Sequence, residues 1–225
     1  TDFHYLRDVW RRTTEKDALV GVSMTGIASG NVLKLNMKEA SLEVKKENRR
    51  VANQIGIKAA ARTTCVKPAG TTSLTLGTSS GIHAWHNDYY IRRLRVGKNE
   101  AIYKYLSIYH PDLVEDEFFR PHDTAVISVP QKAPSGAITR DETAMDMLER
   151  VKKVSTEWVR PGHQKGQNTH NVSATVSIRE EEWDTVGQWM WNNRDCYNGL
   201  SVLEMSDNTD LKGELACAGG ACEIS

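Results

Sequence analysis

Two cysteines near the end of the chain are the residues best suited to chemistry. The last nine residues, Cys217-Ala-Gly-Gly-Ala-Cys222-Glu-Ile-Ser225, separate the two thiols by small residues only. The glycines let the chain turn back, so the two sulfurs can reach disulfide distance. A disulfide here closes a loop too small to stabilise a fold, and no further ligands accompany the pair for a metal clip. Unless it is a chance pair, the pattern predicts a mobile dithiol that carries two electrons by disulfide exchange.

A turn rich in glycine and hydroxyl residues is the second candidate site. Lys67-Pro-Ala-Gly-Thr-Thr-Ser73 follows the β-prone run 63–66. Gly70 lets the backbone pass close to a ligand, and the three residues after it offer hydroxyls and backbone N–H donors. A helical turn beginning here would direct unpaired N–H groups and its dipole at an anion such as phosphate. Such turns are common after strands, so the spacing alone does not establish phosphate binding.

The remaining thiols and two histidines have simpler interpretations. Cys65 lies in the β-prone run and is expected to be a buried structural thiol, and Cys196 is expected to be inert. His83 and His86 are three residues apart, but no further His/Cys cluster accompanies them. A metal site is therefore not expected.

Helix and strand patterns alternate along the chain, which favours an α/β architecture. The run 39–62, rich in Ala, Lys and Glu, is expected to form one long helix with Val51, Ile55 and Ala59 on one face. Before it, the short apolar segment 20–26 is expected to be a buried strand.

The second half of the chain repeats this alternation. Residues 125–129 predict a strand closed by Pro130. Residues 141–159 predict a helix capped by Thr139 or Asp141. Its apolar stripe consists of Met147, Leu148, Val151, Val154 and Trp158. A half-buried strand is expected at 172–178, and a helix after the three glutamates at 180–182.

The composition argues against several classes of function. The chain has 225 residues, a formal net charge of +0 and four cysteines. Neutral charge balance argues against general affinity for nucleic acid or anionic membranes, so neither is expected as a partner. Arg92, Arg93 and Arg95, beside Tyr89 and Tyr90, could form a nucleic-acid patch, but an ion-paired or phosphate-facing loop is preferred. Four cysteines are too few for a secreted scaffold, and a cytoplasmic location is expected.

One block of sequence carries a family signature. Lys67-Pro-Ala-Gly-Thr-Thr-Ser-Leu-Thr-Leu-Gly-Thr-Ser-Ser-Gly-Ile-His83, followed by Tyr89-Tyr-Ile-Arg-Arg-Leu-Arg95, resembles adenosylcobalamin-dependent (class II) ribonucleotide reductases. The match is to the later part of their catalytic chain. Further stretches agree in order and spacing, at 21–26, 171–177, 197–201 and, in the thiol tail, 215–224. The resemblance covers nearly the whole chain and is most specific in the first block and the tail.

The resemblance implies a fold and a set of site residues. Residues 1–205 would supply the second half of a ten-stranded α/β barrel, and 206–225 a flexible redox-active tail. In the family, the matching loop holds the phosphates of a ribonucleoside di- or triphosphate. Its positions here are Pro68, Ala69, Gly70, Thr71, Thr72 and Ser73. His83 would approach substrate or cobalamin, or pack within its own loop.

The resemblance also implies the chemistry. The tail pair, matched by Cys217 and Cys222, re-reduces an active-site disulfide and is recharged by thioredoxin or a similar reductant. Adenosylcobalamin is the implied cofactor, and its radical oxidises an active-site cysteine to a thiyl radical. That thiyl radical takes a ribose hydrogen, and the 2′-hydroxyl leaves as water.

The sequence departs from the family in one important respect. The radical cysteine of the family lies in an Asn-x-Cys-x-Glu loop, which this sequence lacks. The sequence also begins at Thr1 without an initiator Met, which suggests a piece of a longer polypeptide, one half of a split protein, or a trimmed chain. We therefore expect the chain to be inactive without an N-terminal half as its partner. The alternatives are a non-catalytic nucleotide-binding or regulatory fragment and a remnant of a split gene.

Overall fold

The computed structural model describes residues 3–205, apart from the side chains of Thr71 and Leu74. The chain forms two compact units, one of Thr1–Trp85 with Gly136–Ser225 and one of His86–Ser135. The predicted tail at 206–225, with its cysteine pair, lies outside the described residues. The expected boundary between barrel and tail therefore stays a prediction.

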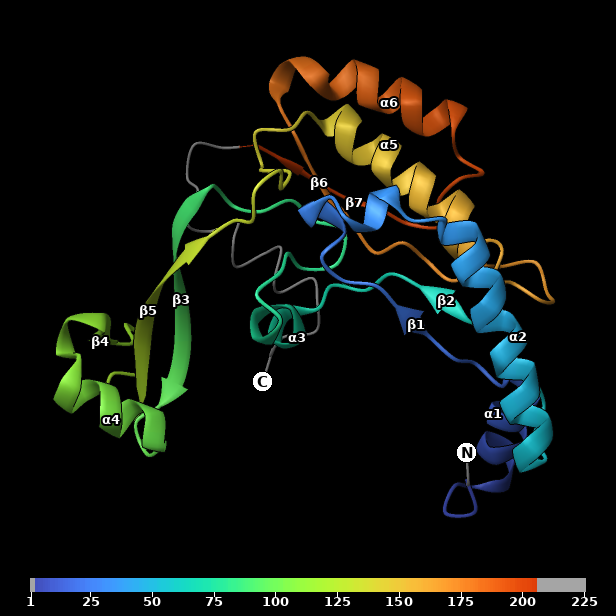
Figure 1. Ribbon diagram of the computed structural model, residues 1–225, viewed down its shortest axis with the longest axis horizontal. Helices are drawn as coiled ribbons and strands as arrows, with labels where there is room; N and C mark the ends of the chain where they lie inside the picture. The colour runs from blue at the N-terminus through green and yellow to red at the C-terminus, as the bar shows by residue number, and fades with distance from the viewer. Residues whose placement is uncertain (1–2, 206–225) are drawn as a thin grey trace. The chain divides into compact units, whose positions relative to one another are not determined.

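The larger unit is built on short parallel strands. β1 (Val22–Ser23) pairs with β2 (Thr64–Cys65), and β6 (Thr175–Ile178) pairs with β7 (Ser201–Glu204). These are two separate two-stranded sheets, and one parallel bridge between Val66, just after β2, and Val172, before β6, links them (Figure 1). Because parallel neighbours need crossover connections, helices lie between successive strands. The predicted α/β class is confirmed, while the ten-stranded barrel stays a prediction.

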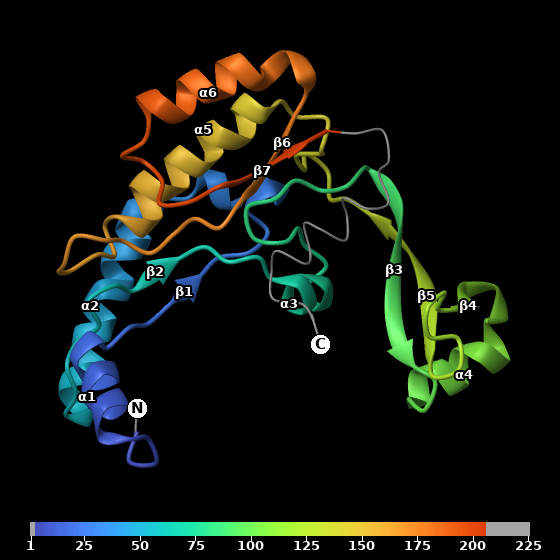
Figure 2. The same cartoon turned by 180° about the vertical axis from the view of Figure 1, so that it is seen from behind.

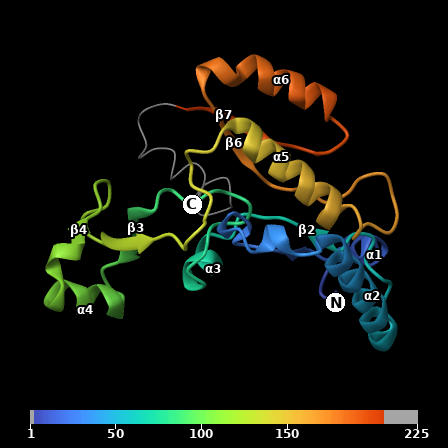
Figure 3. The same ribbon diagram turned by 45° about the horizontal axis from the view of Figure 1, so that its top comes forward.

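The helices of the larger unit connect these strands. They are α1 (Asp8–Asp17), α2 (Met37–Ile55), α3 (Gly70–Thr75), α5 (Ala144–Val154) and α6 (Trp183–Asn192), with the 3₁₀ turns η1 (Ile27–Ser29), η2 (Val32–Lys34) and η5 (Glu180–Glu182). The π-helix η4 (Ser155–Val159) continues directly from α5. Figures 1 and 3 show α2, α5 and α6 in one helical layer, and α3 apart from it, beyond the carboxyl end of β2.

The core of the larger unit lies between α5, α6 and the strands. Every member of the stripe predicted for 141–159 is buried: Met147, Leu148, Val151, Val154 and Trp158. The alternation predicted for 172–178 is confirmed as well, with Val172, Ala174, Val176 and Ile178 buried. Val186 and Trp189 bring α6 onto the same core. Burial of these apolar side chains is what holds α5 and α6 against the strands.

The helix predicted at 141–159 begins later than expected. Its N-cap is Thr143, and the predicted caps Thr139 and Asp141 lie before the helix. The Thr143 hydroxyl accepts the N–H of Asp146 at 3.1 Å, and the Asp146 carboxylate accepts the N–H of Thr143 at 3.0 Å. This reciprocal pair satisfies two helix-end donors together, which fixes the start of α5.

α2 is shorter than predicted, and the face that carries Val51 and Ile55 is not the face that is buried. The helix expected over 39–62 ends at Ile55, where Gly56 has φ +74°. Glycine takes this left-handed conformation at little cost and so ends the helix despite the alanines that follow. Val51 and Ile55 are exposed, and the buried positions of α2 are Met37, Ser41 and Ala52. Val51 and Ile55 lie on the helix as predicted, whereas Ala59, expected on the same face, lies beyond its end.

The strand predicted at 20–26 is present only as β1. Val20 and Val22 are exposed, so the prediction of a buried strand is wrong. Within the described residues, β1 pairs with β2 alone, which makes it an edge strand. An edge strand leaves one side without a neighbour and buries correspondingly less of its side chains.

The smaller unit is a three-stranded antiparallel sheet with one α-helix. β3 (Tyr89–Gly97) and β4 (Val114–Asp116) flank β5 (Thr124–Lys132), and α4 (Ala101–Tyr109) with the 3₁₀ turn η3 (Pro111–Leu113) leads from β3 to β4 (Figure 2). β5 runs through Pro130, where the sequence predicted its end. β4 reaches only as far as Ile127 on β5, so the missing N–H of Pro130 costs no bond to β4.

Two of the three arginines predicted to lie in a loop form ion pairs on this sheet. Arg93 lies 3.6 Å from Glu115, and Arg95 lies 3.4 Å from Glu117. Both arginines lie on β3, so the ion pairing is confirmed and the segment predicted as a loop is a strand.

Among the residues that the structure describes, no helix is long and apolar enough to span a membrane.

Candidate functional site

The 67–73 loop lies where the carboxyl ends of β1 and β2 meet. β2 ends at Cys65, and the chain passes through the loop into α3, which begins at Gly70. Because β1 and β2 are parallel, the segment after β1 reaches the same edge of the sheet. Ligands of open parallel sheets bind at this edge. The helical turn that the sequence required for an anion site is present.

The first turn of α3 offers backbone donors. The first intrahelical bond runs from the N–H of Ser73 to the carbonyl of Ala69, at 2.9 Å. The helix therefore leaves the N–H groups of Gly70, Thr71 and Thr72 without an intrahelical acceptor. Ser73 has a different role, because it is fully buried and its hydroxyl donates to the carbonyl of Gly70 at 3.0 Å. It braces the turn from inside.

A second segment, residues 79–83, backs the 67–73 loop, and we call it the clamp loop. Its first contacts are with the chain after β1. The carbonyl of Ser79 accepts the N–H of Gly26 and the hydroxyl of Thr25, each at 3.0 Å. Gly81 donates its N–H to the Thr25 hydroxyl at 2.9 Å and accepts the N–H of Ile27 at 3.0 Å. These bonds fix the clamp loop to residues 25–27, although the two segments are far apart in the sequence.

The clamp loop also touches the 67–73 loop directly. The hydroxyl of Ser80 accepts the N–H of Ala69, the residue before α3, at 3.1 Å. Gly81 has φ +56°, and a Cβ at this position would lie 2.8 Å from the carbonyl oxygen of Lys67. Such an approach requires glycine. The clamp loop therefore fixes the backbone that leads into α3.

His83 ends the clamp loop as a structural residue. Its Nε2 accepts the N–H of Thr175 on β6 at 3.0 Å, so the proton lies on Nδ1, which donates to the carbonyl of Ser80 at 3.2 Å. Burial lowers the pKa of His83, and the nearby Arg150 lowers it further, so the ring is neutral at pH 7. Of its two expected roles, packing within its own loop is the one these contacts support.

Arg150 on α5 reaches the clamp loop from the helical layer. Its Nε donates to the carbonyl of Ile82 at 3.2 Å, and its two Nη groups donate to the carboxylate of Glu142 at 2.6 Å each. The Arg150 side chain is 5% exposed and that of Glu142 13%. The buried pair thus connects α5 to the segment behind the 67–73 loop.

The structure describes two of the four cysteines. Cys65 is buried, and burial raises the pKa of its thiol, as expected of a structural cysteine. Cys196 is partly exposed and forms no disulfide. Within residues 3–205, no group of three or more His, Cys, Asp and Glu side chains could hold a metal ion. Cys217 and Cys222 lie outside the described residues.

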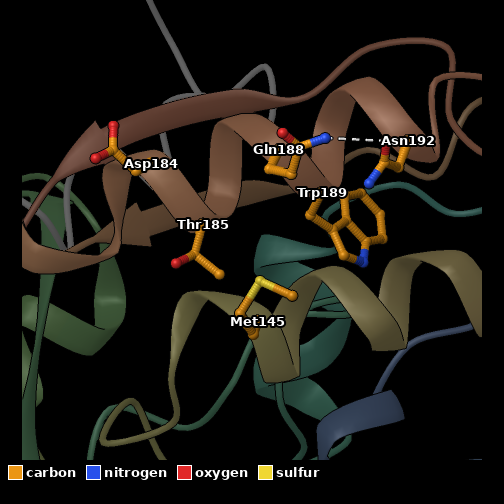
Figure 4. Close-up of a pocket in the computed structure, with 6 residues that line it drawn as sticks. All are labelled: Met145, Asp184, Thr185, Gln188, Trp189 and Asn192. Carbon is orange, nitrogen blue, oxygen red and sulfur yellow. Dashed lines mark hydrogen bonds between the residues drawn. The ribbon is translucent and has the colours of Figure 1, made fainter.

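A pocket elsewhere in the larger unit does not belong to this site. Its volume is about 470 Å³, and it lies between α5 and α6 (Figure 4). It is lined by Met145, Asp184, Thr185, Gln188, Trp189 and Asn192. None of these residues belongs to the 67–73 loop or to the clamp loop, so we assign it no part in anion binding.

Sequence reasoning found the 67–73 loop but not what holds it. Ser80 and Gly81 lie within the family block without a role of their own, and no local pattern marks Arg150. Their contacts join residues 11, 56 and 68 positions apart. The available signal was Gly81, since a glycine among small residues after a short helix indicates a close backbone approach.

Comparison with known proteins agrees with the resemblance seen in the sequence. No protein-family model matches this chain. Over 184 residues, which are 76% of this chain and 24% of the other, it is 27% identical to the adenosylcobalamin-dependent ribonucleoside-triphosphate reductase of Euglena gracilis. It also matches the crystal structure of a B12-dependent (class II) ribonucleotide reductase with a TM-score of 0.68 and 17% identity, over 96% of this chain and 35% of that one. The chain is therefore similar in sequence and fold to about a quarter to a third of such an enzyme.

Proposed function

We propose that this chain is the C-terminal part of a ribonucleotide reductase catalytic chain, which converts ribonucleotides to deoxyribonucleotides. The likeness to class II reductases in both sequence and fold supports this. Because the chain spans only a part of those proteins, the complete reaction needs a second part. We assign that role to an N-terminal half that carries the radical cysteine.

The observation that carries the proposal is the position of the first turn of α3. Three backbone N–H groups, of Gly70, Thr71 and Thr72, lie at the carboxyl edge of the parallel strands. They form the cradle for the phosphates of a ribonucleoside di- or triphosphate. Pro68 and Ala69 hold the backbone before the cradle, and Ser73 braces it from within.

The role of this chain in the reaction is then to bind and to supply electrons. The 67–73 loop, which we now call the phosphate loop, orients the nucleotide so that the ribose faces the radical cysteine of the partner half. Loss of the 2′-hydroxyl as water takes two electrons and two protons, and a dithiol that becomes a disulfide supplies both. Cys217 and Cys222 would restore that dithiol by exchange and would be recharged by thioredoxin or a similar reductant.

The described residues do not identify a cobalamin site. Adenosylcobalamin is implied by the relatives, and a cobalt ligand from this chain would have to be a histidine with a free ring nitrogen or a comparable donor. His83, the candidate in the matched block, uses both ring nitrogens for hydrogen bonds to protein backbone. We therefore derive no step of the reaction through the cofactor.

Replacing a single backbone donor tests the phosphate loop. Proline is tolerated at the first position of a helix and has no N–H, so Gly70→Pro removes one donor and leaves α3 able to form. We expect it to weaken binding of inorganic tripolyphosphate about tenfold, measured by calorimetry, because one hydrogen bond to a charged group is lost. Gly77→Ala is the control, since it lies outside the loop and an added Cβ there would meet nothing within 4 Å, and its affinity should stay within about twofold of wild type. Equal affinity of Gly70→Pro and wild type would contradict the assignment.

The catalytic proposal is tested by reconstitution. The chain is mixed with an N-terminal half, ribonucleotide, adenosylcobalamin and a thioredoxin system, and deoxyribonucleotide is measured. Product that requires both chains supports a reductase. A stable, assembled pair without product would instead favour a non-catalytic nucleotide-binding fragment.

The thiol tail is tested in the same assay. Cys217→Ser or Cys222→Ser should abolish turnover with thioredoxin and leave turnover with a small dithiol largely intact, because a small dithiol can enter the site without the tail. Equal loss with both reductants would argue against a shuttle.

A further inference from the structure

The clamp loop has one anchor that the proposed reaction does not account for. Arg150 comes from the helical layer, and its side chain is almost fully buried, yet within the described residues its hydrogen bonds go to Ile82, Glu142 and Met147 and not to the 67–73 loop or α3. A buried arginine costs desolvation free energy, so its position calls for a compensating set of bonds.

The bonds of Arg150 account for that position. Two Nη groups donate to Glu142, one of them also lies 2.9 Å from the sulfur of Met147, and Nε donates to the carbonyl of Ile82. The ion pair with Glu142 fixes the plane of the guanidinium. With the plane fixed, the remaining Nε–H points at one backbone oxygen of the clamp loop.

Two sets of contacts connect Ile82 to the phosphate loop: those of its neighbours Gly81 and His83, and the hydrogen bond between Ser80 and Ala69. Ile82 lies between Gly81, which packs on the Lys67 carbonyl, and His83, whose ring holds the Ser80 carbonyl. Ser80 in turn holds the N–H of Ala69, the residue that precedes the first free donor of α3. A shift of Ile82 would therefore displace the backbone at Ala69, where the chain enters α3.

We propose that Arg150 is a positioning residue for the phosphate loop, acting through the clamp loop to hold the free N–H groups of α3 in place for a nucleotide. This inference rests on the proposed phosphate site. It predicts that Arg150 affects phosphate binding without touching the phosphate.

Lysine cannot replace arginine in this arrangement. A lysine ammonium can pair with Glu142, but it has no planar fork to hold two carboxylate oxygens and one backbone carbonyl together. Arg150→Lys therefore retains the buried charge balance and loses the fixed direction toward Ile82. Its effect on the phosphate loop should exceed its effect on stability.

The first measurement needs no ligand. Hydrogen exchange of the Ala69 amide, followed by NMR, reports the bond from Ala69 to Ser80. We expect Arg150→Lys to speed this exchange about tenfold, the equivalent of one hydrogen bond. Thr143→Ala is the matched control, because it removes the N-cap of the same helix and leaves Arg150 in place. It should speed Ala69 exchange no more than it speeds exchange across the larger unit.

The second measurement is the affinity for inorganic tripolyphosphate. We expect about a tenfold loss in Arg150→Lys and a change within about twofold in Thr143→Ala. If Arg150→Lys fails to fold, the double variant Glu142→Gln/Arg150→Met replaces it, because it removes both charges and leaves neither one buried alone. The double variant should show the same loss of affinity and the same faster exchange.

The outcomes separate this inference from the function on which it rests. Wild-type chain that does not bind tripolyphosphate, alone or with its N-terminal half, would refute the phosphate site and the inference with it. Wild-type binding that is unchanged in a folded Arg150 variant would refute the inference alone. Faster exchange and weaker binding in proportion to a general loss of stability, as in Thr143→Ala, would make Arg150 merely structural and would also overturn it.

Discussion

Gly81 is the position at which a single methyl group should do the most damage to the candidate site. Its φ is +56°, and a Cβ there would lie 2.8 Å from the carbonyl oxygen of Lys67 and 3.4 Å from the Cα of Pro68. Both neighbours are backbone atoms, which cannot turn away as a side chain would. Gly81→Ala must therefore displace the start of the phosphate loop or strain the clamp loop.

The structure supplies a control that separates these two costs. Gly77 has nearly the same φ, +60°, and a Cβ there would meet nothing within 4 Å. Gly77→Ala should thus carry only the left-handed penalty, about 1 kcal/mol. Gly81→Ala carries that penalty and an overpacking cost of about 1–3 kcal/mol. The stabilising effect of alanine on the unfolded chain is the same in both variants and cancels in the difference.

Thermal unfolding converts this difference into a measurable one. A domain of this size loses about 2–4 °C of Tm per kcal/mol, so we expect a drop of about 2–4 °C for Gly77→Ala and about 4–16 °C for Gly81→Ala, whose two costs sum to about 2–4 kcal/mol. Tripolyphosphate binding should be lost in Gly81→Ala and kept in Gly77→Ala. Equal Tm values for the two variants would refute the close approach of Gly81 to Lys67.

Three further predictions follow from buried groups. The lowered pKa of His83 means that its stabilising contribution is complete above pH of about 6.5, the unfolded value, and is lost as the pH falls toward the folded pKa. His83→Gln should therefore reduce the fall of Tm as the pH drops below about 6.5, and an unchanged slope would contradict this. With the tail cysteines replaced by serine, a thiol reagent at neutral pH should modify Cys196 well before Cys65, whose burial raises its pKa, and the reverse order in mass spectra would contradict the structure. Glu117 accepts hydrogen bonds from Arg95 and from the N–H groups of Phe119 and Arg120, and Glu117→Gln weakens all three. The free energy of unfolding of the smaller unit should fall by about 1–2 kcal/mol, and amide exchange at 117–120 should be faster. Unaltered exchange would contradict the role of Glu117 in holding residues 117–120.

The parts of the fold that sequence reasoning predicted well are those decided by local burial. The stripe of α5 and the alternation at 172–178 place apolar residues at the helical and strand periods, and these residues are buried in the core as predicted. The length of α2 was predicted poorly because composition favours helix through residue 62, whereas Gly56 ends it by its backbone conformation. The buried face of α2 depends on which neighbours cover it, and no local pattern contains that information.

The candidate site divides in the same way. The 67–73 loop could be predicted, since a glycine followed by hydroxyl residues after a strand is a local signal. The clamp loop could not, because its bonds to Thr25, Arg150 and Thr175 come from three distant parts of the chain. The compact unit of 86–135 was not predicted for a related reason, since β3, expected to be a loop, is a strand through its pairing with the distant β5.

The distances along the chain between these partners set an order of assembly. Ile82 and Arg150 are 68 residues apart, and His83 and Thr175 are 92 residues apart. During synthesis the 67–73 loop leaves the ribosome long before either distant partner has been made. Each contact also costs loop-closure entropy, which delays it until neighbouring elements have docked. A nascent chain therefore completes the contacts of the clamp loop late, after β6 has been made, and the 67–73 loop stays without its backing while this region is still being translated.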